Sequence, residues 1–204
     1  MRQPVPLEPG KYYHIYNRGV NGEDIFVEER NYAHFLNLYA KHIEPVADTF
    51  AYCLLCNHFH LLIRIKDPSG LRDLTGLNGG REDLTGLVTR HYSNFFNAYA
   101  KAINKAYHRT GTLFETPFRR IEVTSDRYFV RLVHYIHWNP QKHGFALDFR
   151  TYLHSSYAAL SSDKPTRLKR DEVLGWFNGR TEFIALHQVL TDEREVADLI
   201  GEDG

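Results

Sequence analysis

The sequence predicts an α+β protein built on one four-stranded antiparallel sheet, and two observations carry this prediction. Strand-like and amphipathic helical runs alternate in the order strand, helix, strand, strand, helix, strand, helix between residues 11 and 138. The second and third strands are separated only by Cys56 and Asn57, which fits a tight antiparallel hairpin. The first six elements therefore form a βαββαβ unit, the ferredoxin-like arrangement of an antiparallel sheet with helices on one face.

Local signals set the bounds of the expected elements. The first strand stops at the turn signal Asn17–Gly19, and the first helix stops before Pro45. Pro117 interrupts the fourth strand, so we expect its first half to lie at a sheet edge or a bulge. Asn139 and Pro140 are expected to end the last helix. In order, the expected elements are a strand at 11–17, a helix at 28–43, strands at 46–55 and 58–65, a helix at 84–107, a strand within 113–123 and a helix at 126–138.

Two segments lie outside this unit. The stretch 67–86 contains a five-residue duplication beside two glycines, and we expect it to be a loop expansion. After a linker at 161–169, short helical pieces are expected around 171–177, 181–190 and 192–200. We therefore divide the chain into a main domain at 1–160 and a C-terminal helical extension at 161–204.

The composition is that of a protein with a packed core, because 43% of the 204 residues are hydrophobic. No apolar run approaches the length of a membrane span, and the first residues lack the apolar core of a signal peptide. We therefore expect a cytoplasmic protein with no membrane partner. The two cysteines are too few for a disulfide framework. The formal net charge is zero, but bases outnumber acids between Arg90 and Arg131. That imbalance suits either a phosphate backbone or an ordinary mixed-charge surface.

Two histidines in the third strand are candidate metal ligands. Side chains alternate along a strand, so His58 and His60 project from one face while Phe59 points to the other. Two imidazoles on one face are half of a metal site, and a packed strand would hold them rigidly. The alternative is a half-exposed strand that happens to carry histidines.

The last helix of the unit carries a second group of polar residues. Tyr135 and Asn139 are four residues apart and share one side of the helix, beside the apolar stripe and not within it. Arg131 extends this side by another turn. An amide oxygen can complete a site for a hard metal, and a tyrosine can attack phosphorus.

These motifs resemble those of a known family. The His58–His60 triplet after a hairpin is similar to the histidine–hydrophobe–histidine motif of HUH single-strand DNA endonucleases. The run Tyr-Ile-His-Trp-Asn-Pro at 135–140 resembles a motif of REP-associated tyrosine transposases, relatives of single-tyrosine insertion-sequence transposases. The similarity runs from about Tyr12 through Tyr157 and includes the segments 17–19, 111–114, 117–120 and 155–157.

The resemblance implies an HUH-type fold and a set of roles. Tyr135 would attack a phosphodiester, release a 3′-hydroxyl and keep a 5′-phosphotyrosine. His58, His60 and Asn139 would hold one divalent ion, Mg²⁺ or Mn²⁺. The implied substrate is single-stranded DNA, commonly next to a hairpin, and the protein would act as a monomer or homodimer. One departure is Cys56, which stands where these proteins often have proline.

Several other residues are candidates for contacts with DNA, although ordinary solvated bases and surface histidines are an open alternative for each. These candidates are Arg18, Lys101, Lys105, Arg119, Arg120, Arg131 and His137.

Two competing interpretations stay open at this point, a zinc site and a nucleic-acid-binding module without cleavage. The spacing of Cys53, Cys56, His58 and His60 superficially suggests zinc, but positions i and i+3 on a strand face opposite ways. The chain could also be a nucleic-acid-binding module that has the fold without strand cleavage, because fold alone does not determine chemistry.

Overall fold

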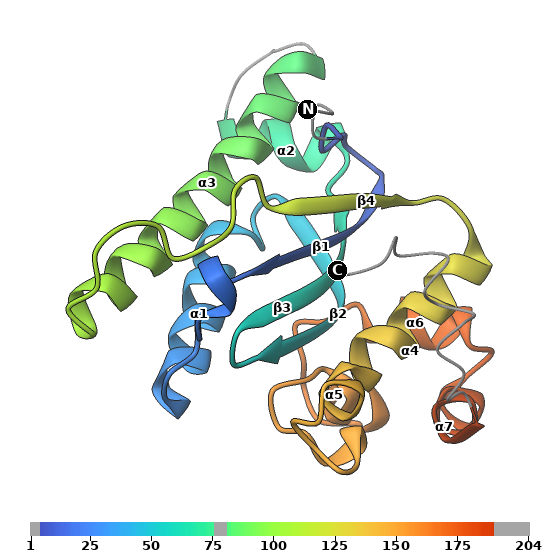
Figure 1. Ribbon diagram of the computed structural model, residues 1–204. Helices are drawn as coiled ribbons and strands as arrows, with labels where there is room; N and C mark the ends of the chain where they lie inside the picture. Colours follow the sequence, from blue (N-terminus) through green and yellow to red (C-terminus); the bar gives the residue numbers. More distant parts are fainter. Residues whose placement is uncertain (1–4, 76–80, 190–204) are drawn as a thin grey trace.

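The computed structural model describes residues 5–75 and 81–189 (Figure 1). Four strands form one sheet in the order β2-β3-β1-β4, and every neighbouring pair is antiparallel. This is the strand order of a ferredoxin-like βαββαβ unit, so the predicted fold class is confirmed. The strands are β1 (Tyr12–Arg18), β2 (Ala47–Leu55), β3 (His58–Ile65) and β4 (Arg119–Val123).

One face of the sheet is covered by two helices, α1 (Glu29–His42) and α3 (Arg81–Ala106) (Figure 1). Phe59 of β3 packs against Phe35 of α1, and the ring centroids are 5.2 Å apart. The helix α1 begins with a capping box, in which the side chains of Glu28 and Asn31 satisfy each other's backbone N–H groups. This layer is the βαββαβ core that the sequence predicts.

The opposite face is covered by α4 (Asp126–Lys142), which lies across β2 and β3. Ser125 starts the helix, and its side chain accepts a hydrogen bond from the Tyr128 backbone N–H. Around α4 lie three short helices, α5 (Tyr157–Ser161), α6 (Arg170–Trp176) and α7 (Arg180–Val189). The sheet is therefore sandwiched between two helical layers (Figure 1).

The C-terminal helices share the core of the main domain. Trp176 of α6 stacks on Phe129 of α4 with ring centroids 4.1 Å apart. Phe183 of α7 is fully buried in the same apolar cluster as Leu62 of β3. Within the described part of the chain, residues 161–189 therefore complete the layer on the α4 face and do not form a separate core.

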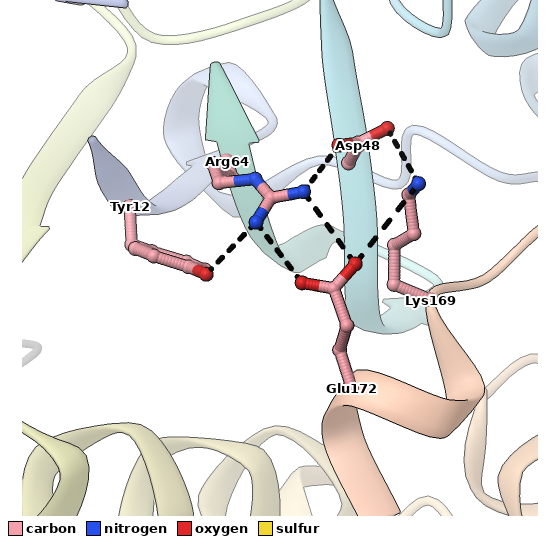
Figure 2. Close-up of polar contacts among 5 residues, drawn as sticks. All are labelled: Tyr12, Asp48, Arg64, Lys169 and Glu172. Carbon is pink, nitrogen blue, oxygen red and sulfur yellow. Dashed lines mark hydrogen bonds and ion pairs between the residues drawn. The ribbon is translucent and has the colours of Figure 1, made fainter. Parts of the chain in front are cut away.

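A polar cluster also attaches α6 to the sheet (Figure 2). Arg64 of β3 pairs with Asp48 of β2 at 2.8 Å and with Glu172 of α6 at 3.0 Å. The same guanidinium donates a hydrogen bond to the Tyr12 hydroxyl at 3.2 Å. Lys169 lies 3.5 Å from Asp48, so two cations and two carboxylates alternate around the cluster.

The structure corrects several expected bounds. Asn139 and Pro140 do not end α4, which continues to Lys142. Proline is tolerated there because the missing N–H removes one bond from a helix that has only one turn left. The expected loop at 67–86 is largely helical where it is described, since α2 spans Pro68–Thr75 and α3 begins at Arg81. The fourth strand is shorter than expected but lies at the sheet edge. The expected piece at 192–200 lies outside the described residues.

Within the described ranges, none of the helices combines the length and the apolar character that crossing a bilayer requires.

Candidate functional site

Strand register places three histidines, one tyrosine and one arginine on the sheet face that α4 covers. Tyr16 of β1 lies opposite His60 of β3 and opposite Arg119 of β4, so these three side chains share a face. His14 and His58 follow on the same face because each is two residues from one of them. The predicted common face of His58 and His60 is therefore present, and β1 adds a third histidine to it.

The two hairpin histidines lie at right angles to each other. Their ring centroids are 5.2 Å apart, with an interplanar angle of 90°. The His58 Nδ1 lies 2.7 Å from the Asn57 side-chain oxygen, which fixes the outer ring. His60 Nδ1 lies 3.0 Å from His14 Nε2, which fixes the inner ring. In each ring, Nδ1 is thus held by a neighbouring polar group.

Helix α4 brings the tyrosine and the asparagine to this histidine group. The Tyr135 ring centroid lies 5.6 Å from that of His60 and 6.4 Å from that of His14. Lys142 is the last residue of the same helix, and its Nζ lies 5.1 Å from the Tyr135 ring centroid. The residues that the sequence separates into two motifs therefore meet in one place within a single chain.

The burial of these residues differs from the expectation. Tyr135 is 2% exposed and Asn139 is fully buried, so neither lies on an open edge of α4. The reason is that both residues face the β-sheet, where Tyr135 meets His14 and His60 and Asn139 lies next to His58, while α5 and α7 cover the other side of the helix. A helix that is enclosed on two sides buries a far wider arc than its apolar stripe.

Buried polar atoms at this place lack partners within the described chain, among them one of Asn139 and one of His60. The Asn139 Nδ2 donates to the Tyr135 backbone oxygen at 2.9 Å, but its Oδ1 meets no partner at hydrogen-bonding geometry within the described chain. His60 Nε2 is also unpartnered there. Asn139 is nevertheless close enough to His58 to act on its pKa as a hydrogen-bonding neighbour. Orphaned buried acceptors are costly, and a bound cation would satisfy them.

Burial keeps the histidines of the site uncharged. It lowers the pKa of His58 to about 4, with smaller contributions from positive charge on His143 and Arg18. Burial likewise lowers the pKa of His60 well below its ordinary value and that of His14 to about 3. Neutral imidazoles carry the lone pair that a metal requires.

The described residues offer nothing that resembles a zinc centre. Among them, no three histidine, cysteine, aspartate or glutamate side chains are placed to share a metal ion. Cys53 is fully buried among apolar residues, and this burial raises the pKa of its thiol well above the ordinary value. The cysteine–histidine interpretation therefore has no geometric support, whereas two imidazoles and an amide oxygen remain together.

An open cavity of about 200 Å³ borders the histidines. Arg18 and Arg119, two of the predicted DNA contacts, line it together with His58 and His60. Arg18 is ion-paired to Glu115 at 3.1 Å and is half exposed. A cavity with two guanidinium groups beside neutral imidazoles is suited to a phosphate.

The other candidate DNA contacts lie elsewhere. Arg120 points to the opposite face of the sheet, where its guanidinium lies 4.7 Å from the Phe118 ring centroid. Lys101 and Lys105 are exposed on α3, on that same far side. Arg131 is half-buried on α4. Only Arg18 and Arg119 of the seven candidates therefore line the cavity.

The structure corrects the expectation that His137 contacts DNA. It is fully buried, with Nδ1 2.8 Å from His187 Nε2 and Nε2 2.8 Å from the Ser156 hydroxyl. These bonds hold α4 to α7 and to the segment before α5. A side chain enclosed in this way has no surface to offer to DNA, so we assign it a packing role.

Sequence reasoning missed two residues of the site, His14 and Lys142, and it considered His143 as a phosphate contact without selecting it. The signal for His14 was present, because Tyr12, His14 and Tyr16 alternate on one face of the first strand. Lys142 lies two helical turns after Tyr135, but the expected end of the helix at Asn139 hid this relation. His143 lies against His58 with ring centroids 5.1 Å apart.

Comparison with known proteins supports the fold and goes no further. No family model matches the sequence, and no curated protein matches it. A solved structure of a REP-associated tyrosine transposase bound to a REP hairpin is similar, with a TM-score of 0.51 and 12% sequence identity. The match covers 78% of this chain and 83% of that chain. At this identity the likeness shows a shared fold, while function must be argued from the site.

Proposed function

We propose that the protein cleaves and rejoins single-stranded DNA next to a hairpin, through a covalent 5′-phosphotyrosine on Tyr135. The observation that carries this proposal is the distance of 5.6 Å between the ring centroids of Tyr135 and His60. A chain with the same fold is bound to a DNA hairpin, which supports the same class of substrate. The reaction would serve DNA transposition or a host process that uses the same chemistry.

The proposed cleavage exchanges one phosphate ester for another. The Tyr135 hydroxyl oxygen attacks the phosphorus, and the bond from phosphorus to the 3′ oxygen breaks. The phenol loses its proton and the departing 3′ oxygen gains one. The products are a free 3′-hydroxyl and a 5′-phosphate ester of Tyr135. Rejoining reverses these changes, because an incoming 3′-hydroxyl displaces the tyrosine oxygen from phosphorus.

Side chains of this chain supply charge and orientation for both steps. The Lys142 ammonium, whose Nζ lies 5.1 Å from the Tyr135 ring centroid, would pair with the negative charge of the incoming phosphate. Arg18 and Arg119 line the cavity beside His58 and would neutralise the phosphates on either side of the reacting one. Because Tyr135 is 2% exposed, we propose that DNA displaces the exposed Lys142 when it reaches the phenol.

A divalent cation, Mg²⁺ or Mn²⁺, is the cofactor we propose. His58, His60 and Asn139 would hold it, and the donor set fits. The His60 Nε2 and Asn139 Oδ1 are buried without partners within the described chain, and the imidazoles are neutral. When bound, the cation supplies Lewis acidity that polarises the phosphate and offsets its charge.

A second candidate is a nucleic-acid-binding protein that has lost strand cleavage. The low exposure of Tyr135 favours this candidate, because a buried phenol cannot reach phosphorus unless its surroundings move. The cavity lined by Arg18 and Arg119 would serve binding equally well in either case.

Trapping of a covalent adduct distinguishes these two candidates. The protein is incubated with Mn²⁺ and a pool of 3′-labelled hairpin oligonucleotides that have randomised single-stranded flanks. The proposal expects label that stays on the protein after denaturation. Tyr135→Phe should abolish the adduct, whereas the matched change Tyr128→Phe on the same helix should leave it.

Binding to the same pool completes the test. His58→Ala should lose the adduct and keep the fold, because the half-buried ring is replaced by a smaller side chain. A protein that retains the pool on a filter but never forms an adduct would establish the binding-only candidate.

A further inference from the structure

His14 and His60 form a hydrogen-bonded pair beneath the site. They project from the neighbouring strands β1 and β3, and His14 Nε2 lies 3.0 Å from His60 Nδ1. Both rings are buried, with exposures of 0% and 2%. The two rings are close to coplanar, at an interplanar angle of 20°. This geometry joins ring nitrogens edge to edge.

A single hydrogen bond between two neutral imidazoles allows only two arrangements. In the first, His60 donates from Nδ1 to His14 Nε2, so His60 Nε2 keeps a lone pair. In the second, His14 donates from Nε2, so His60 must carry its hydrogen on Nε2. The role of His60 Nε2 is therefore coupled to the tautomer of His14.

The outer nitrogen of each ring contacts no group that would select one of these two arrangements over the other. His60 Nε2 and His14 Nδ1 both lack a hydrogen-bond partner among the described residues. The bond between the two rings is thus the one polar contact, within the described chain, that distinguishes the two nitrogens of His60. Metal-binding histidines commonly use a second hydrogen bond of this kind to fix their tautomer.

Packing holds the His14 ring in place. Its centroid lies 4.7 Å from that of Tyr16 at an angle of 25°, and 6.4 Å from that of Tyr135 at an angle of 84°. One aromatic ring thus stacks on it and another meets it edge-on. A ring enclosed in this way keeps Nε2 directed at His60 without help from solvent.

We propose that His14 is a positioning residue that holds His60 as the Nδ1–H tautomer, so that the lone pair of Nε2 is directed at a divalent cation. This inference rests on the proposed function, because it concerns the same cation. It goes further by assigning the tautomer of His60 to a residue that does not touch the cation. A carboxylate or a backbone carbonyl usually fills this role, and the His14 imidazole fills it with its own hydrogen on Nδ1, which leaves Nε2 to accept.

Two substitutions separate the hydrogen bond from the space that His14 fills. His14→Phe keeps a ring and removes the acceptor, so the Nδ1–H form of His60 loses the hydrogen bond that favours it. His14→Gln restores an acceptor, because its amide oxygen reaches about as far along the side chain as Nε2 does. His34→Gln removes an exposed histidine from α1 on the far face and serves as the matched control.

The experiment has one measurement on metal-free protein and one with Mn²⁺. Long-range ¹H–¹⁵N spectra of the histidine rings give the tautomer of each histidine before any metal is added. Isothermal titration with Mn²⁺ then gives the dissociation constant. We expect His60 to be the Nδ1–H form in the wild type and in His14→Gln. We expect His14→Phe to weaken Mn²⁺ binding about 10- to 100-fold, with His14→Gln and His34→Gln within a few-fold of wild type.

Each result bears on a different statement. An Nε2–H form of His60 in the metal-free wild type overturns the inference, and this measurement stands even if His14→Phe does not fold. Unchanged Mn²⁺ affinity in a folded His14→Phe also overturns it and leaves the proposed function intact. A wild type that binds no Mn²⁺ but shows the Nδ1–H form contradicts the proposed cofactor, while the control of the tautomer by His14 survives.

Discussion

Acidification should destabilise this protein steeply, because several of its histidines are buried and uncharged. Burial lowers the pKa of His14 to about 3, that of His58 to about 4 and that of His187 to about 3. An unfolded histidine has a pKa of about 6.5. At pH values between the folded and the unfolded pKa, these histidines are protonated in the unfolded chain but not in the folded chain. The free energy of unfolding is therefore fully present above pH 6.5 and is lost as the pH falls through 6.5 towards the folded pKa values.

The magnitude follows from these pKa values. Each of the three histidines costs about 2 kcal/mol of stability between pH 7 and pH 5, or about 6 kcal/mol in total. Near pH 5.5 the slope is about 3 to 4 kcal/mol per pH unit, since almost three protons are taken up on unfolding. The whole stability of a domain is about 5–15 kcal/mol. Burial lowers the pKa values of His60 and His137 in the same direction, so we expect unfolding near pH 5.

Urea unfolding at pH 7, 6, 5.5 and 5 measures this loss through the fluorescence of Trp138 and Trp176. His187→Gln should remove about one proton from the uptake, which lowers the slope near pH 5.5 by about 1.2 kcal/mol per pH unit. His34→Gln, which removes an exposed histidine, should leave the slope as it is. A change of less than about 1 kcal/mol between pH 7 and pH 5 would refute the reasoning, because it would mean that the buried histidines accept protons in the folded state.

Four further outcomes test the arrangement of the site and of the layers. Arg119→Gln should weaken binding of single-stranded DNA and lower the salt slope by about 0.7, whereas Arg120→Gln on the other face should not, as salt titration of binding would show. Phe183→Ala should cost about 3–5 kcal/mol in a single urea transition, and a separate early transition would contradict a shared core. Glu172→Gln should cost about 0.5–1 kcal/mol at low salt and less at 1 M salt, since this carboxylate is part-exposed. Saturating Mn²⁺ at about 100 times its dissociation constant should add about 2.7 kcal/mol to the unfolding free energy, and His58→Ala should lose this gain.

The local pattern of the chain was enough to predict most of the fold. Alternation and turn signals placed the hairpin strands close to their observed bounds, because strand period and turn chemistry act over a few residues. The end of α4 was wrong for a related reason. Pro140 favours a helix end on local grounds, but the packing of the last turn outweighs one missing hydrogen bond.

The candidate site was predictable in part. The shared face of His58 and His60 follows from strand period, and the relation of Tyr135 to Asn139 follows from helix period. The burial of Tyr135 and the enclosure of His137 could not be predicted. The burial of Tyr135 depends on His14 and His60 of the sheet, and the enclosure of His137 depends on α5 and α7, which follow α4 in the sequence. No pattern within one helix indicates what will pack against its second side.

The sequence by itself determined the βαββαβ order, the face that the hairpin histidines share, and the presence of a tyrosine and an amide one helical turn apart. Only the tertiary structure decided that these groups meet, and that His14, 46 residues before His60, lies 3.0 Å from it. The physical reason is that periodicity is a property of neighbouring residues, whereas the pairing of β1 with β3 is chosen by the burial of two whole faces of the sheet.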